Sequence, residues 1–131
     1  MTISNAILVS TYDASGYLTR QTEGSSEFLY TYQNGNLASE VIKRNGVVST
    51  TITYEYYTDK NSSALPLISF YGYDAGVQFG TKNKNLLKKS TVNGSVVNYM
   101  YEFNSDGYVS KTTASGSGTS TSTETYTYMC K

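Results

Sequence analysis

The chain has 131 residues, which is enough for a single domain over residues 1–131, and its ten basic and ten acidic side chains give a formal net charge of zero. This balance provides no general attraction to nucleic acid or to an anionic membrane surface. The chain contains no histidine, which removes the usual acid–base catalyst at neutral pH and the commonest nitrogen ligand of metals. We therefore expect no enzyme, and no cofactor or metal site.

Strand patterns recur along the chain, separated by short turns rich in Asn, Asp and Gly. Connections this short place consecutive strands side by side, so the predicted fold class is an all-β antiparallel meander of about eight to ten strands. Such a sheet is expected to curl into a barrel or to bend strongly. The predicted strands are Ile3–Tyr12, Tyr17–Thr22, Glu27–Gln33, Leu37–Lys43, Val47–Tyr57, Leu86–Val92, Val96–Asn104, Tyr108–Ala114 and Ser120–Met129.

One hairpin unit is repeated. In Tyr30–Leu37 and Tyr101–Val109, aromatic residues occupy alternate positions, an Asn-Gly or Asp-Gly turn follows, and a hydrophobic residue restarts the alternation. Tyr12–Leu18 keeps the tyrosine, the turn and the restart.

The alternation also assigns the two faces of the sheet, because residues two apart in a strand share a face. One face is predicted to be aromatic and the other mostly hydroxyl-bearing. The aromatic face takes Phe28, Tyr30, Tyr32, Ile52, Tyr54, Tyr56, Val97, Tyr99, Tyr101, Phe103, Tyr126 and Tyr128, and the opposite face takes Thr31, Thr51, Thr53, Glu55, Asn98, Glu102, Thr125 and Thr127.

Residues 58–85 interrupt this rhythm with a hydrophobic insert centred on Leu65–Tyr73. An unstructured loop of this length is uncommon in a small domain. The insert is predicted to be a short helix or an irregular plug over the open end of the sheet, and a further strand plus a loop is the alternative.

Tyrosine is the remaining functional signal, with 14 residues and no tryptophan. In the aromatic face it is interpreted as core, its hydroxyls reaching the sheet ends or each other. Tyrosines outside that face can stack on sugar rings or anchor a protein partner. They are Tyr17, Tyr57, Tyr71, Tyr73 and Tyr108. The predicted contact cluster for a ligand or partner is Tyr71, Tyr73, Asp74 and Gln78.

The hairpin unit resembles the tyrosine-aspartate (YD or Rhs-type) repeats of bacterial surface proteins. The order of Gly80–Leu86, Tyr99–Lys111 and Tyr126–Tyr128 after a hydrophobic insert resembles a Bacteroidetes family of secreted or lipid-anchored proteins of unknown function with a porin-like fold. The resemblance implies a curled antiparallel sheet and a location in the cell envelope, periplasmic or surface-exposed. Met1–Val9 lacks the basic region and lipobox cysteine of a lipoprotein signal, so it is predicted to be a first strand.

These observations favour a non-enzymatic envelope protein that acts as a binding or structural module. Its expected partner is a glycan or another surface protein, with no direct membrane span. Two alternatives stay open. One is a self-associating β module, a homo-oligomer formed through free edge strands, and the other is a barrel that carries a small apolar ligand.

Overall fold

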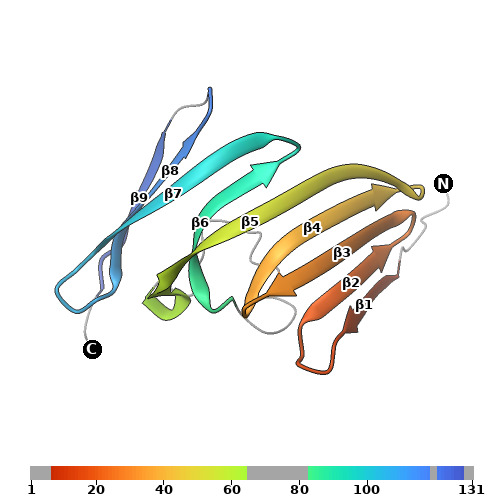
Figure 1. Cartoon of the computed structure of the whole chain (residues 1–131), viewed down its shortest axis with the longest axis horizontal. Coiled ribbons are helices and arrows are strands. Elements are labelled where there is room, and N and C mark those ends of the chain that lie inside the picture. Colours follow the sequence, from red (N-terminus) through yellow and green to blue (C-terminus); the bar gives the residue numbers. More distant parts are fainter. Residues whose placement is uncertain (1–6, 65–82, 119–120, 129–131) are drawn as a thin grey trace.

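The computed structural model describes residues 7–64, 83–118 and 121–128, which form one nine-stranded antiparallel sheet (Figure 1). The strands follow one another across the sheet in chain order, so the topology is the predicted meander. A 3-10 turn, η1 (Ser62–Ala64), follows the fifth strand. The strands are β1 (Leu8–Tyr12), β2 (Leu18–Glu23), β3 (Ser26–Gln33), β4 (Asn36–Arg44), β5 (Val47–Asn61), β6 (Asn85–Val92), β7 (Ser95–Phe103), β8 (Val109–Gly116) and β9 (Ser122–Thr125).

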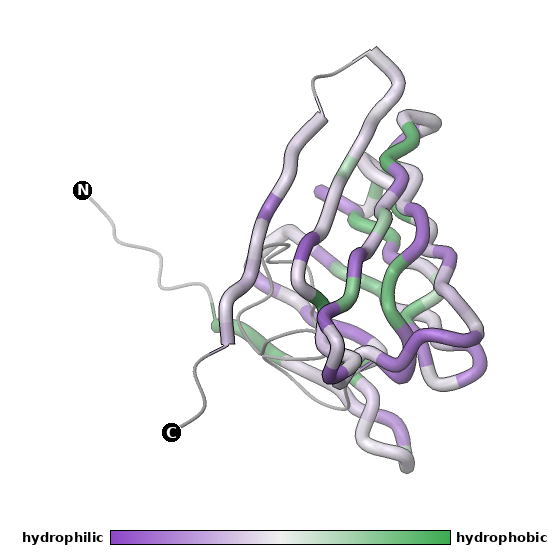
Figure 2. Tube along the Cα trace, turned by 90° about the vertical axis from the view of Figure 1, so that its left-hand side faces the viewer, coloured by the Kyte–Doolittle hydropathy of each residue, from purple (hydrophilic) through white to green (hydrophobic). Residues whose placement is uncertain are grey.

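The sheet is strongly bent and does not close (Figures 1 and 2). Its end strands, β1 and β9, each pair with one neighbouring strand of the described sheet and not with each other. The all-β meander is therefore confirmed in its strongly bent form, and the alternative of a closed barrel is wrong. The described strands accordingly enclose no barrel interior for an apolar ligand.

Three of the hairpins turn on an Asn-Gly pair. Asn34, Asn45 and Asn93 have φ angles of 53°, 51° and 47°, and each is followed by a glycine that also has positive φ. Two successive residues with positive φ define the type I′ turn, whose twist matches that of the strands it connects. The local sequence thus fixes these tight connections.

The strand registers bear out the predicted faces. Tyr30 lies opposite Glu40, Glu40 lies opposite Ile52, and Tyr54 lies opposite Ser90, which puts all five on one face. Hydrophobic and hydrophilic positions alternate along the strands (Figure 2). The opposite face carries ion pairs between directly opposed residues, at Glu27–Lys43 (3.5 Å), Glu55–Lys89 (2.7 Å) and Glu102–Lys111 (2.6 Å).

Among the described hydrophobic residues, the most deeply buried are those with which a strand restarts after a turn. Leu18, Leu37, Leu86 and Val109 are 1%, 2%, 2% and 0% exposed. All four lie at the starts of even-numbered strands, at the same end of the sheet. The repeated hairpin unit therefore builds a row of core residues across this end of the sheet.

Some predicted boundaries differ. β5 continues to Asn61, four residues beyond the predicted Tyr57, because bulges near Tyr56 let Asn61 pair with Asn85. β9 begins at Ser122 and ends at Thr125, so it is shorter than predicted. The central part of the insert, residues 65–82, lies outside the described residues, as do residues 3–6 of the predicted first strand.

Candidate functional site

The predicted contact residues Tyr71, Tyr73, Asp74 and Gln78 all lie outside the described residues, so that cluster stays a prediction. Among the other singled-out tyrosines, Tyr57 and Tyr108 lie beside an opening in the sheet. This opening is the candidate site.

The opening forms because β6 and β7 separate toward the end of the sheet at which the even-numbered strands begin. Their pairing runs from Val92↔Ser95 to Lys89↔Asn98 and stops there. Beyond that point β6 stays with β5 and β7 stays with β8. The two halves of the sheet, β1–β6 and β7–β9, therefore diverge at this end of the sheet (Figure 1).

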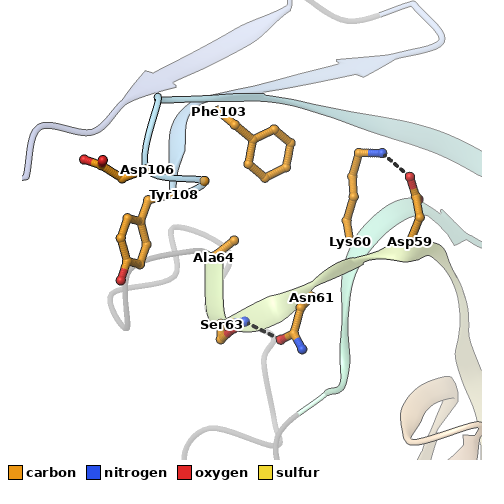
Figure 3. A pocket seen from close by; sticks show the side chains of 9 residues that line it. Asp59, Lys60, Asn61, Ser63, Ala64, Phe103, Asp106 and Tyr108 are labelled. Atoms are coloured by element: carbon orange, nitrogen blue, oxygen red, sulfur yellow. Dashed lines mark hydrogen bonds and ion pairs between the residues drawn. The ribbon is translucent and has the colours of Figure 1, made fainter.

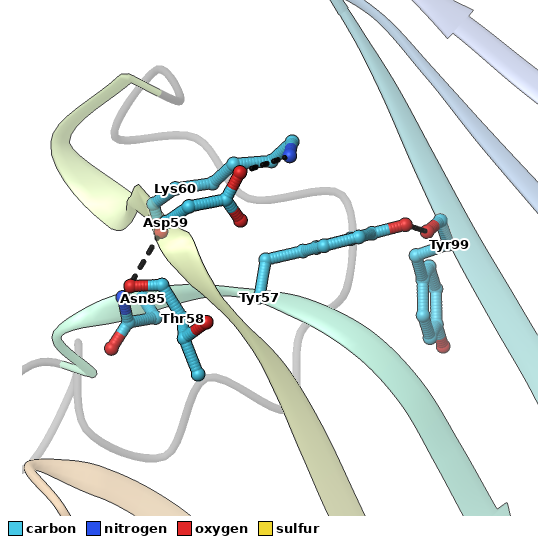
Figure 4. Close-up of polar contacts among 6 residues, drawn as sticks. All are labelled: Tyr57, Thr58, Asp59, Lys60, Asn85 and Tyr99. Atoms are coloured by element: carbon cyan, nitrogen blue, oxygen red, sulfur yellow. Dashed lines mark hydrogen bonds and ion pairs between the residues drawn. The ribbon is translucent and has the colours of Figure 1, made fainter.

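Tyrosine hydroxyls bridge the separated strands. The Tyr57 hydroxyl donates to the carbonyl of Tyr99 at 2.8 Å, and the Tyr101 hydroxyl donates to the carbonyl of Leu87 at 2.8 Å. The rings of Tyr57 and Tyr101 also meet edge to face, with centroids 6.0 Å apart. Figure 4 shows the Tyr57 side chain reaching from β5 to the backbone of β7. These contacts replace the backbone bonds that a continuous ladder would make, and they hold the strands at a fixed separation.

Beyond these bridges lies a hollow of about 570 Å³, a size typical of small-ligand sites. One wall comes from the end of β5 and η1, and the other comes from the end of β7 and the β7–β8 turn. We call it the β5–β7 hollow. It is lined by Asp59, Lys60, Asn61, Ser63, Ala64, Phe103, Asp106, Gly107 and Tyr108.

The two walls differ in chemistry. Phe103 and Tyr108 contribute aromatic rings from the β7–β8 side, and they are 39% and 49% exposed. The β5–η1 side contributes the amide of Asn61, the hydroxyl of Ser63 and the Asp59–Lys60 ion pair. Figure 3 shows Phe103 facing the opening between these walls. The hollow can therefore hold a ligand with one apolar face and one hydrogen-bonding face.

The β7–β8 turn is held by the side chain of Asn104. Its Oδ1 accepts hydrogen bonds from the backbone N–H groups of Asp106 at 3.0 Å and Tyr108 at 2.9 Å. Gly107 takes a φ of +83°, which suits a residue without Cβ. The Asn side chain therefore fixes the backbone from which Tyr108 and Asp106 project.

The charges of the hollow are largely compensated on its β5 side. The Lys60 ammonium lies 3.0 Å from a carboxylate oxygen of Asp59 and 4.6 Å from the centre of the Tyr57 ring. The hydrogen bond from Lys60 lowers the pKa of the Asp59 carboxyl, so Asp59 is ionised at neutral pH. The Asp106 carboxylate makes no hydrogen bond or ion pair with any described residue. In Figure 3 this carboxylate lies at the outer rim and points away from the opening.

The described residues contain no group of three His, Cys, Asp or Glu side chains that could hold a metal ion. Within the same ranges, no helix is long and apolar enough to cross a membrane.

Sequence reasoning identified one residue of this site as a contact candidate, Tyr108, which stands outside the aromatic stripe. Phe103 was assigned to the aromatic face as core, and it is exposed because β6 leaves β7 before reaching it. Asn61 and Ser63 were considered part of the insert. The polar run Asp59–Ser63 beside a broken strand rhythm was the available signal for this wall.

No family model matches the chain, and no curated protein matches it either. The resemblance to Bacteroidetes envelope proteins therefore stays a prediction.

Proposed function

We propose that this protein is a non-enzymatic binding module of the bacterial cell envelope and that its ligand is a glycan held in the β5–β7 hollow. The observation that carries the proposal is the pairing of two exposed aromatic rings with a polar wall across one open hollow. The envelope location comes from the resemblance of the hairpin units to those of bacterial surface proteins.

A sugar ring has one apolar face and a polar rim, which complement the aromatic and polar walls of the hollow. Its C–H face packs on an aromatic ring, while its hydroxyls exchange hydrogen bonds with amides, hydroxyls and carboxylates. Phe103 and Tyr108 offer the rings, and Asn61 and Ser63 offer the polar groups. An open hollow also admits a chain that continues on both sides of the bound residue.

The test is native affinity electrophoresis and calorimetry against galactomannan, xyloglucan, soluble starch and mucin glycans. We expect one glycan to bind, and we expect Phe103→Ala and Tyr108→Ala each to weaken that binding by about tenfold or more, as removal of a central aromatic contact does. Met100→Ala is the matched control for Phe103→Ala. Met100 lies on β7, as Phe103 does, and it is 58% exposed, but it lies on the opposite face of the sheet.

No binding across the panel would overturn the glycan proposal. Binding that both aromatic variants leave unchanged would overturn the assignment of the hollow. Capture of a surface protein, lost in the same two variants, would keep the hollow and replace the class of ligand.

A second candidate function is self-association through the free edge strands, and β1 is the specific observation in its favour. None of its five residues is charged, and Leu8 and Val9 are 50% and 53% exposed. An apolar edge strand without charges is a template for pairing with a strand of another chain.

A further inference from the structure

The β1–β2 and β7–β8 turns are two copies of one structure. Oδ1 of Asp13 accepts from the N–H groups of Ser15 and Tyr17 at 2.9 and 3.0 Å, as Oδ1 of Asn104 does from Asp106 and Tyr108. The backbone bond from residue 13 to residue 17 measures 2.9 Å, and the bond from residue 104 to residue 108 measures 2.8 Å. The glycine before each tyrosine has the same φ of +83°.

Each copy presents its tyrosine in the same way. The Tyr17 ring lies against Tyr32 with centroids 4.5 Å apart and an interplanar angle of 37°. The Tyr108 ring lies against Tyr128 with centroids 5.3 Å apart and an angle of 36°. In both copies a second tyrosine from a later segment fixes the orientation of the turn tyrosine.

The surroundings of Tyr17 are polar, as those of Tyr108 are. Its hydroxyl approaches the β3–β4 turn and lies 3.8 Å from the position that a Cβ on Gly35 would take. The next residue, Asn36, exchanges hydrogen bonds with Asn85, and Lys84 packs against Gly35. An aromatic ring and a lysine therefore meet at this turn, as they do at the β5–β7 hollow, while the buried amides of Asn36 and Asn85 bond each other beneath them.

Both turns project from the same end of the sheet, the one at which the even-numbered strands begin (Figure 1). Six strand spacings separate them, roughly 29 Å measured along the sheet at the spacing of paired strands, and the divergence of β4 from β5 and of β6 from β7 lengthens this path. One extended chain of several sugar residues can span that distance, whereas a single sugar ring cannot.

We propose that Tyr17 forms a second glycan subsite, so that one polysaccharide chain engages both turns at once. This inference rests on the proposed function and names its ligand class as a polymer rather than an isolated terminal sugar. Engagement at the first subsite raises the local concentration of the chain at the second, and the avidity for the polymer exceeds the affinity for a fragment.

The experiment compares galactomannan, xyloglucan, soluble starch and mucin glycans with their mono- to trisaccharide fragments. We expect Tyr17→Ala to reduce affinity for the bound polymer about tenfold or more and to leave fragment affinity unchanged. Tyr108→Ala should weaken both. Tyr17→Leu retains apolar contact with Tyr32 but loses the flat ring, so it should behave like Tyr17→Ala if the alanine variant proves unstable.

The two failures are distinguishable. Equal polymer affinity in wild type and Tyr17→Leu, with polymer binding still lost in Tyr108→Ala, would overturn the second subsite alone. An absence of all glycan binding would overturn the proposed function with it. Loss of both polymer and fragment binding in a folded Tyr17→Leu would also contradict two separate subsites.

Discussion

Gly35 occupies a position in the β3–β4 turn that leaves almost no room for a side chain. Its φ is +79°, and a Cβ built there would lie 3.3 Å from the Cβ of Lys84. Lys84 has little freedom to move away, because its N–H donates to the Gly35 carbonyl at 2.9 Å. Gly46 has nearly the same φ, +78°, with nothing within 4 Å of such a Cβ.

This contrast separates backbone strain from crowding. We expect Gly46→Ala to lower the free energy of unfolding by about 1 kcal/mol, the cost of a positive φ for a residue with Cβ. Gly35→Ala should cost about 1 kcal/mol more, because the methyl group also crowds Lys84. Urea unfolding of both variants measures the difference, and equal losses would show that the two turns are under the same constraint.

Glu40 is a carboxylic acid on the aromatic face with 4% of its surface exposed. Burial raises its pKa, and the hydrogen bond from the Tyr54 hydroxyl at 3.3 Å opposes the rise only in part. The folded state therefore holds the Glu40 proton more tightly than the unfolded state does. It follows that the contribution of Glu40 to stability is most favourable below the ordinary pKa of 4.5 and declines as pH rises through the folded-state pKa.

Replacing this acid by a neutral amide removes that decline. We expect Glu40→Gln to raise the free energy of unfolding at pH 7 by about 1–3 kcal/mol relative to wild type and to change it little at pH 4. Subtracting the two proteins at each pH cancels the shared contribution of exposed carboxylates such as Glu55, whose pKa Lys89 lowers. A difference that does not vary between pH 4 and pH 7 would refute the assignment.

At the level of the elements, the strands separate in a regular way at the end of the sheet where the even-numbered strands begin. Two strands that are joined by a turn at this end stay paired there, whereas two neighbouring strands that are joined at the opposite end diverge. The pairing of β4 with β5 ends at Ser39↔Thr53, as that of β6 with β7 ends at Lys89↔Asn98. Because strands twist, a pair joined at one end tends to separate toward the other.

The second tyrosine of three Tyr-x-Tyr units spans such a separation. The hydroxyls of Tyr56, Tyr101 and Tyr128 donate to the carbonyls of Leu37, Leu87 and Val109 at 2.8, 2.8 and 2.7 Å. Each acceptor lies within the first two or three residues of an even-numbered strand. The tyrosine repeat thus satisfies backbone carbonyls where the ladder is interrupted, which gives the high tyrosine content a structural reason.

Tyr57 adds a further bridge across the β6–β7 separation, and removing its hydroxyl tests that role. We expect Tyr57→Phe to lower the free energy of unfolding by about 1 kcal/mol, the usual net value of one hydrogen bond, and to speed hydrogen exchange at the end of β7. Tyr56→Phe removes a bond of the same length between β4 and β5 and is the matched control. Equal exchange at the end of β7 in the two variants would contradict a specific bridging role for Tyr57.

At the scale of the whole molecule, the sequence was sufficient for whatever depends on local pattern. The period-two alternation assigned the two faces, and the Asn-Gly pairs located three turns. The hydrophobic residues that restart the alternation after a turn, such as Leu37 and Val109, are buried in the structure. Each of these features is set within a few neighbouring residues.

The separation of β6 from β7 was not predicted, because it depends on where the register between two strands stops and on the accumulated twist of the sheet. Phe103 follows the same alternation as Tyr101, and only the departure of β6 leaves its ring exposed. The polar wall of the hollow comes from the continuation of β5 to Asn61, which depends on bulges and a distant partner, Asn85. The candidate site therefore arises at an interruption of the repeat rather than within it.

The two ends of the open sheet differ in a way that predicts how copies of the chain associate. β1 carries no charge, whereas β9 is only four residues long and contains Glu124. Two copies of β1 can pair antiparallel about a two-fold axis, which closes the assembly at a dimer. Pairing of β1 with β9 of another copy would instead leave free edges and continue into a filament.

We therefore expect Val9→Lys to abolish any dimer, because a lysine on an edge strand disfavours pairing with another chain. Val92→Lys is the control. Val92 is 38% exposed, and it pairs with Ile52 of β5 on one side and with Ser95 of β7 on the other, so it does not lie on an edge strand. Sedimentation equilibrium over a range of concentrations, with reductant present to prevent disulfides through Cys130, gives the mass of each protein. A wild-type monomer throughout, or a dimer that survives in Val9→Lys, would rule out self-association through the β1 edge.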